Sequence, residues 1–255
     1  MMETNFGSGK LSKFCWKLHR HILNLDERAF LSRLFGPDQA ERHDFNEFCQ
    51  ELQGFKTAMT EYAAREVPLD LHPDYEQVLC PRKSWFPLFY SIIRIQQPAA
   101  LVETGCATGF TSSLVLYALK QNGKGRLTSI DIPPRKGQFE MPWSLRDGLK
   151  SGYLVPSTLR VDGRWSLMLE NARNALPRLL QSEGFRQIDV FYHDSDHSFG
   201  HQMWEYLTVW PHLSPGGLLL SDDIGWSSAF RDFSRHVGRK MAIHKGTTNF
   251  GAIRK

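Results

Sequence analysis

The spacing of apolar residues changes near residue 80 and divides the chain into two parts. In the segment LSKFCWKLHRHILNL, residues 11–25, apolar positions recur every three or four residues, which is typical of an amphipathic helix. Asp26 can cap a second helix over ERAFLSRLF, which the Gly-Pro pair at 36–37 ends. The next segment, DQAERHDFNEFCQELQGFKTAMTEYAAREV, predicts one or two further helices.

Short apolar strands alternate with helical segments from Ser84 onward. After a helix in SWFPLFYSIIRIQQ, the pattern predicts strands at 99–103, 126–130, 158–161, 188–193 and 217–220. It predicts helices near 109–120, 166–180 and 201–213. Such alternation is typical of βαβ units around a parallel sheet. The last two apolar runs, KMAIH and FGAIRK, are separated only by KGTTN, so we expect them to pair in antiparallel fashion.

These patterns predict a helical N-terminal extension over residues 1–80 and an α/β domain over residues 81–255. A chain of 255 residues with 41% hydrophobic content is long enough for one such domain with additions. Because a basic amphipathic helix more often packs on its own domain or on a partner subunit than on a membrane, the N-terminal helices are a candidate surface for a homodimer.

Composition and charge narrow the class of protein. The net charge of +4 is spread along the whole chain, which is too mild to indicate nucleic-acid binding. The four cysteines are far apart and form no CxxC pair. We therefore expect neither a disulfide framework nor a zinc knuckle, and a cytoplasmic location. No apolar run approaches the roughly 20 residues that cross a bilayer, so we expect no membrane span.

A glycine-containing loop follows the first predicted strand of the sheet. Gly105 and Gly109 lie between Glu103, which ends that strand, and a helix that begins near Phe110. Glycines let the backbone approach a ligand, and the helix start offers free N–H groups. The spacing is not the G-x-G-x-x-G of dinucleotide sites, and Glu103 suits a cationic or amino-bearing ligand better than a diphosphate. Asp131 ends the next strand, where such folds hold ribose hydroxyls; a tight turn without a ligand is the alternative.

These residues resemble the motifs of class I S-adenosylmethionine-dependent methyltransferases. ETGCATG is similar to their first motif, Asp131 to their ribose-binding acid, and RVDGRWS at 160–166 to the turn after their third strand. The resemblance covers about residues 84–255 and implies a Rossmann-like, seven-stranded, mostly parallel sheet with an antiparallel last strand. It implies that the methionine part of the cofactor is surrounded by Gly105, Cys106 and Gly109, with Glu103 and Ser112 nearby. It also implies that Asp162 and Gly163 lie beside the adenine.

Three aspartates follow the fourth and fifth predicted strands. Asp194 comes directly after the fourth strand, and Asp222 and Asp223 come directly after the fifth. Because neighbouring parallel strands end at one edge of a sheet, we expect the three carboxylates to converge. They would repel one another unless a hard divalent cation such as magnesium, calcium or manganese lay between them. The alternative is that these aspartates only cap neighbouring helices and form no common site.

The acidic residues resemble the metal site of O-methyltransferases of the catechol and the macrocin (macrolide-sugar) types. Asp194, Asp222 and Asp223 match the metal-binding positions of those families, and DSDH at 194–197 matches the D-x-x-H of the macrocin type. The resemblance implies that His197 is the general base and that Asp194 serves both the metal and His197. The segment departs from those families because Asp196 adds a fourth carboxylate.

Two further histidines, His193 and His201, are spaced by four residues from His197. Because His193 ends a strand, the three side chains do not share one helix, and we do not expect a three-histidine metal site. His193 and His201 are therefore interpreted as ordinary residues.

The leading hypothesis is an S-adenosylmethionine-dependent O-methyltransferase, assisted by Mg²⁺ or another hard divalent cation. Its acceptor would be a small hydroxylated molecule such as a sugar, a phenol or a natural-product intermediate. One alternative is a metal-independent N- or O-methyltransferase of the same fold. Others are a cofactor-binding protein without catalysis and a nicotinamide oxidoreductase, which Glu103 and the glycine spacing disfavour.

Overall fold

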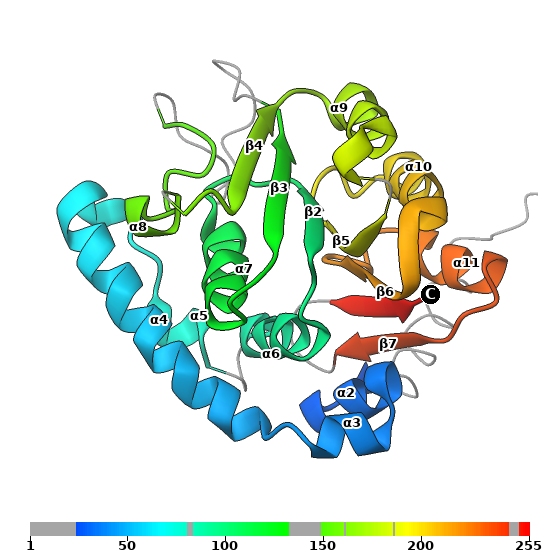
Figure 1. Ribbon diagram of the computed structural model, residues 1–255, viewed down its shortest axis with the longest axis horizontal. Helices are drawn as coiled ribbons and strands as arrows, with labels where there is room; N and C mark the ends of the chain where they lie inside the picture. Colours follow the sequence, from blue (N-terminus) through cyan, green and yellow to red (C-terminus); the bar gives the residue numbers. More distant parts are fainter. Residues whose placement is uncertain (1–23, 81–83, 133–148, 161, 186, 245–249) are drawn as a thin grey trace, which may run out of the picture.

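An eight-stranded sheet with helices on both faces organises the chain (Figure 1). The computed structural model describes residues 24–80, 84–132, 149–160, 162–185, 187–244 and 250–255. The strands lie in the order β1-β7-β8-β6-β5-β2-β3-β4. Their bounds are Asn24–Leu25 (β1), Ala100–Thr104 (β2), Arg126–Asp131 (β3), Trp165–Leu169 (β4), Ile188–His193 (β5), Leu213–Ser221 (β6), Met241–His244 (β7) and Gly251–Arg254 (β8).

Strands β2, β3, β4, β5 and β6 pair in parallel with one another, whereas β8 is antiparallel to both β6 and β7. The mostly parallel sheet with an antiparallel end is therefore confirmed. β1 adds an eighth strand, parallel to β7, where the sequence pattern predicted the end of a helix. The rest of that predicted helix, residues 11–23, lies outside the described residues.

The two faces of the sheet carry separate apolar clusters, because successive side chains of a strand point to opposite faces. Leu101 and Tyr192 pack with α4 (Phe45–Glu66), α6 (Phe86–Gln96) and α7 (Phe110–Gln121). Their neighbours Val102 and Phe191 pack on the other face with α9 (Ala172–Gln181), α10 (Phe199–Val209) and α11 (Ala229–His236). Both clusters lie directly beneath the carboxyl ends of β2 and β5, so those strand ends are held firmly.

The N-terminal helices start and stop where the caps predict. α2 spans Glu27–Phe35, with the Asp26 side chain accepting a bond from the Ala29 N–H (2.8 Å), and Gly36 ends it at φ 89°. Beyond α3 (Pro37–Glu41), the long helix α4 packs against α6 (Figure 1). Buried residues of α2 and α4 belong to the same apolar cluster as the sheet. Short helices α5 (Tyr75–Val78) and α8 (Ser157–Arg160) connect the larger elements.

The third strand of the domain lies later in the chain than predicted. Residues 157–160 form the short helix α8, in which the Arg160 side chain donates to the carbonyls of Gly152 and Val155 (2.7 and 2.8 Å). β4 instead covers Trp165–Leu169, and the helix predicted from 166 starts at Ala172. β4 is an edge strand without alternating burial, and Leu169 is 50% exposed, so its sequence lacks the period-two signal of a strand.

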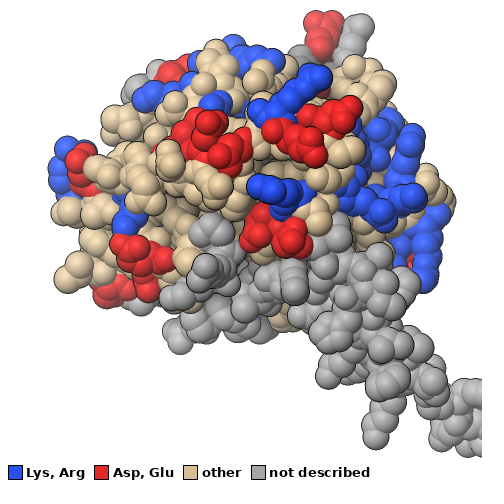
Figure 2. Space-filling model, turned by 90° about the horizontal axis from the view of Figure 1, so that it is seen from below, with Lys and Arg blue, Asp and Glu red and all other residues tan. Residues whose placement is uncertain are grey.

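The surface carries charges of both signs. Figure 2 shows acidic and basic side chains across one face, with basic ones gathered toward one end. Among the described residues, no helix is long and apolar enough to cross a membrane. The predicted homodimer, the cytoplasmic location and the absence of nucleic-acid binding stay predictions.

Candidate active site

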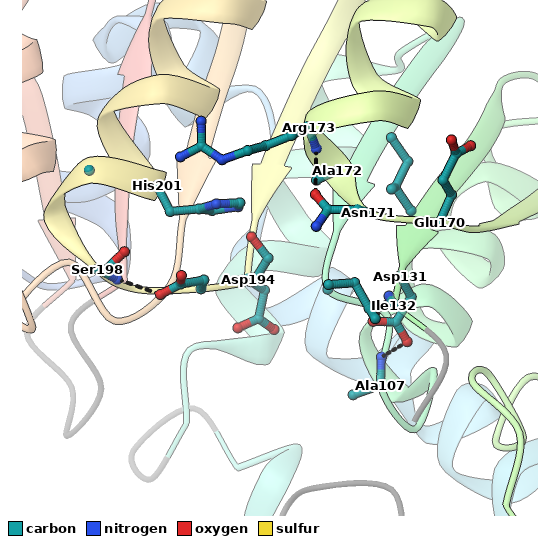
Figure 3. A pocket seen from close by; sticks show the side chains of 15 residues that line it. Ala107, Asp131, Ile132, Glu170, Asn171, Ala172, Arg173, Asp194, Ser198 and His201 are labelled. Carbon is teal, nitrogen blue, oxygen red and sulfur yellow. Dashed lines mark hydrogen bonds between the residues drawn. The ribbon is translucent and has the colours of Figure 1, made fainter. Parts of the chain in front are cut away.

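A cavity of about 530 Å³ opens at the carboxyl ends of β2, β3 and β5 (Figure 3). Loops and helix starts from both halves of the sheet line it. On one side lie Asp131 at the end of β3, Ile132 directly after it, and Glu170 and Asn171 from the turn after β4. On the other side lie Asp194, Ser198 and His201. This is the crevice in which open α/β sheets bind their ligands.

The loop after β2 fits only glycine at two positions. Gly105 has φ 86°, and a side-chain carbon there would lie 1.9 Å from the Asp194 carbonyl oxygen. Gly109 has φ 85°, and a side-chain carbon there would lie 2.6 Å from the Cα of Gly152. Both positive φ values and both close approaches exclude larger residues. At Gly105 the loop thus lies in close contact with the turn after β5, and both segments line the cavity.

Asp131 ends β3 inside the cavity lining. Its carboxylate accepts bonds from the backbone N–H groups of Ala107 and Ile132, both at 3.1 Å. Burial raises the pKa of Asp131, and these hydrogen bonds act in the opposite direction. The bond from Ala107 joins the glycine loop to β3, so the predicted ribose-binding acid lies next to the predicted methionine-binding loop.

Glu103 lies behind the glycine loop and is fully buried. It accepts hydrogen bonds from the hydroxyls of Ser112 and Ser129, and its Oε2 has no partner among the described residues. Burial raises the pKa of Glu103 to about 7. The Cys106 thiol lies 3.3 Å from the Ser112 hydroxyl. Within the described lining of the cavity, none of these side chains appears, so they support the loop from below.

The three aspartates of the predicted metal site converge at the edge next to this cavity. Burial and then the charge of Asp222 raise the pKa of Asp194, and burial and then the charge of Asp223 raise the pKa of Asp222. The Tyr192 hydroxyl donates to Asp194 (3.1 Å). Asp223 adopts φ 48°, a strained backbone conformation for a residue other than glycine.

None of these aspartates caps a neighbouring helix, because α10 follows Ser198 and α11 follows Ser228. The aspartates therefore do not act as the helix caps that the alternative required. Among the described residues, however, no group of three or more His, Cys, Asp or Glu side chains is arranged to hold a metal ion. The chain therefore brings the carboxylates near one another without placing them around a common centre.

His197 stands between two of the aspartates. Its Nε2 lies 3.6 Å from Asp223 Oδ2 and 3.9 Å from Asp194 Oδ1. Burial, and then the charge of His193, lower the pKa of His197. Its ring centroid is 6.0 Å from that of Trp226, whose side chain is 68% exposed. A neutral imidazole between carboxylates can accept a proton and be stabilised once it is charged.

The part of the chain that forms this edge of the sheet matches a known protein family. Residues 102–224, from β2 through the turn after β6, match the family described as a methyltransferase domain. The chain carries a methyltransferase domain over these residues. Comparison with the curated proteins found no match.

Solved structures with the same fold carry the methyltransferase cofactor. The SAH-bound methyltransferase PaMTH1 from Podospora anserina superposes with a TM-score of 0.52 at 12% identity, over 99% of both chains. An O-methyltransferase from Bacillus cereus in complex with SAH gives 0.51 at 12% identity, over 92% of this chain and 99% of that one. TomG from Streptomyces achromogenes, an O-methyltransferase involved in tomaymycin synthesis and in complex with SAM, gives 0.50 at 15% identity, over 92% and 97%. The predicted class I methyltransferase fold is thus confirmed.

The shift of the third strand places two of the residues predicted beside the adenine away from the cavity. Asp162 and Gly163 precede β4, and Asp162 is paired with Arg164, whose side chain also donates to the carbonyl of Gly125 before β3. They lie at the amino ends of the strands, away from the cavity. The turn that follows β4, Glu170 and Asn171, lines the cavity where the adenine was predicted.

His193 and His201, interpreted from the sequence as ordinary residues, share one hydrogen-bond partner. Both rings bind the fully buried carboxylate of Glu205, His193 through Nδ1 (2.6 Å) and His201 through Nε2 (2.9 Å). Burial would raise the pKa of Glu205, but these hydrogen bonds outweigh it and lower the pKa to about 2. A glutamate four residues after His201 on one helix was the available sequence signal.

Proposed function

We propose that the protein transfers a methyl group from S-adenosylmethionine to a hydroxyl of a small acceptor, such as a sugar, a phenol or a natural-product intermediate. The observation that carries this proposal is the position of Asp194. Its side chain lines the cavity and also lies 3.9 Å from His197, so one residue joins the proposed cofactor site to the proposed base. The SAH- and SAM-bound O-methyltransferases of the same fold support the choice of cofactor and of reaction.

The cofactor would occupy the cavity along the edge of the sheet. Asp131 would accept hydrogen bonds from the ribose hydroxyls, as carboxylates at this position of the fold do. Gly105, Cys106 and Gly109 would surround the methionine part, with Glu103 and Ser112 behind the loop. The turn after β4 would contact the adenine.

The residues of that edge would remove the proton of the acceptor. Methyl transfer to oxygen is an in-line displacement that requires a positioned and deprotonated nucleophile. His197, whose pKa is lowered, would accept the hydroxyl proton. Asp223 and Asp194, at 3.6 and 3.9 Å from its Nε2, would stabilise the charged imidazole that results.

The aspartates fit a hard divalent cation by their chemistry. Asp194, Asp222 and Asp223 offer only oxygen ligands. Burial and then a neighbouring carboxylate raise the pKa values of Asp194 and Asp222, and a cation between these groups would offset that repulsion. We propose that these three residues hold Mg²⁺ when it is present. A bound cation of this kind lowers the pKa of a neighbouring hydroxyl.

A second candidate function is methyl transfer to oxygen or nitrogen without a metal. The observation in its favour is that no group of His, Cys, Asp or Glu side chains in the described ranges is arranged around a common metal position. In that case proximity and His197 alone would supply the catalysis.

Labelled S-adenosylmethionine and a panel of phenols, catechols, hydroxylated sugars and amines test both candidates. We expect a methylated oxygen with Mg²⁺, loss of product in EDTA, and recovery when Mg²⁺ is added back. The D222N variant should show little response to Mg²⁺. Full turnover in EDTA would instead support the second candidate. Cofactor binding without any methylated product would indicate a non-catalytic binding protein.

A further inference from the structure

Glu205 of α10 receives four hydrogen bonds from other side chains although it is fully buried. One carboxylate oxygen accepts from the Thr104 hydroxyl (2.7 Å) and from His193 Nδ1 (2.6 Å). The other oxygen accepts from the Ser195 hydroxyl (3.0 Å) and from His201 Nε2 (2.9 Å). Three of these donors come from outside α10, so a single carboxylate connects the ends of two strands to one helix.

Burial of this carboxylate costs free energy, and the hydrogen bonds that it accepts compensate that cost. A buried anion without partners would destabilise the fold by several kcal/mol. Four donors satisfy both oxygens of Glu205, and hydrogen bonds to a charged acceptor are about twice as strong as neutral ones. The network is therefore rigid, and it holds the residues that donate to Glu205 in fixed positions.

The residues that donate hydrogen bonds to Glu205 either line the cavity or directly precede a residue that does. Thr104 is the last residue of β2 and precedes Gly105, and His193 is the last residue of β5 and precedes Asp194. Both following residues line the cavity, as do Ser195 and His201. Glu205 itself is not among the described lining residues, so it can act on a ligand only through its partners.

We propose that Glu205 is a positioning residue of the cofactor pocket, holding the loop that starts at Gly105 and the turn that starts at Asp194 in one fixed relation. The close contact between Gly105 and the Asp194 carbonyl requires such a fixed relation. This proposal rests on the proposed S-adenosylmethionine site but is independent of the acceptor, the metal and the base.

The test compares two carboxylate networks in E205Q and E51Q. Glu51 of α4 binds Tyr90 (2.7 Å) and Arg94 (2.8 Å) of α6, away from the cavity. Binding of SAH is measured by titration calorimetry, and stability by thermal unfolding. We expect E205Q to weaken SAH binding about tenfold or more. E51Q should lower the Tm and leave SAH binding within about twofold of the wild type.

A milder pair of variants applies if E205Q does not fold. T104V removes one donor to Glu205, whereas T104S keeps the hydroxyl. We expect SAH binding to weaken about threefold in T104V and to return to the wild-type value in T104S.

The proposal is overturned if E205Q, or T104V where E205Q is unfolded, binds SAH as the wild type does. It is also overturned if E205Q and E51Q lose affinity equally, because Glu205 would then be only a structural residue. If the wild type itself does not bind SAH, the proposed function fails. If the wild type binds SAH and E205Q binds it equally well, only the role of Glu205 fails.

Discussion

The two halves of the carboxyl edge are built on different principles. The half formed by β2 and β3 is defined by backbone geometry: glycines at positive φ, a close approach to the next turn, and N–H groups bonded to Asp131. The half formed by β5 and β6 is defined by charge: burial and then the charge of Asp222 raise the pKa of Asp194, and burial and then the charge of Asp223 raise the pKa of Asp222. Backbone contacts thus shape the first half, whereas neighbouring carboxylates shape the second.

The largest expected effect concerns the backbone-defined half. G105A would place a carbon 1.9 Å from the Asp194 carbonyl oxygen, which no side-chain movement can relieve, so the loop and the turn must separate. We expect SAH binding to fall by more than about a hundredfold in titration calorimetry, together with about 1 to 3 kcal/mol of stability.

G163A is the matched control for G105A. Gly163 also has a positive φ, at 70°, but its side-chain carbon would meet nothing within 4 Å. Only a cost of about 1 kcal/mol in stability should appear, with unchanged SAH binding. Equal losses of affinity in the two variants would contradict both the geometry and the corrected position of residues 162–163.

The next effect concerns the base of the charge-defined half. H197A should lower kcat for an acceptor found in the panel by about 10² to 10⁴, which is the range for loss of a general base. SAH affinity should stay unchanged, so variants in the two halves would affect different measurements, kcat in one and SAH binding in the other. H236A, at the exposed end of α11, serves as the control; a similar loss in both variants would remove the assigned role of His197.

A third effect tests the buried acid behind the glycine loop. The pKa of Glu103 is about 7 in the folded protein against 4.5 as a reference, so the folded state binds its proton more tightly than the unfolded state does. Stability is fully retained below about pH 4.5 and is lost as the pH rises through 7, by roughly 3 kcal/mol in all. Urea unfolding should show E103Q to be more stable than the wild type at pH 8 and equal to it at about pH 4.

E61Q, on the exposed side of α4, should leave the pH dependence of the wild type unchanged. Asp131, Asp194 and Asp222 also have raised pKa values and contribute to any slope that remains in E103Q. A slope identical in E103Q and wild type would show that Glu103 does not titrate in this range.

The smallest effect is the response of the charge-defined half to Mg²⁺. At ten times its Kd, a cation that binds only the folded state adds about 1.4 kcal/mol. Thermal unfolding should therefore move upward with Mg²⁺ in the wild type and not in D222N. If D222N and wild type respond equally, the aspartates do not form the metal site.

How far the sequence predicts this molecule depends on whether a feature is local. The cap at Asp26, the strand ending at Asp131 and the glycine loop were predictable, because each depends on neighbours within a few residues. β4 was misplaced because an edge strand with Leu169 half exposed lacks alternation.

Glu205 escaped sequence reasoning for a different reason. Its bond with Thr104 joins residues 101 positions apart, and nothing in the local pattern of α10 specifies that partner. Only the order of β2 and β5 in the sheet brings the two together. Position at a strand end therefore predicts the residues that face a ligand but not the residues that hold those in place.

The exposed indole of Trp226 gives the charge-defined half an optical signal of its own. Its ring centroid lies 6.0 Å from that of His197, and two thirds of its surface is exposed to solvent. A molecule that binds beside His197 therefore changes the environment of this fluorophore. The difference in emission between the wild type and W226F then reports occupancy of that edge by acceptors that are never methylated, including competitive inhibitors.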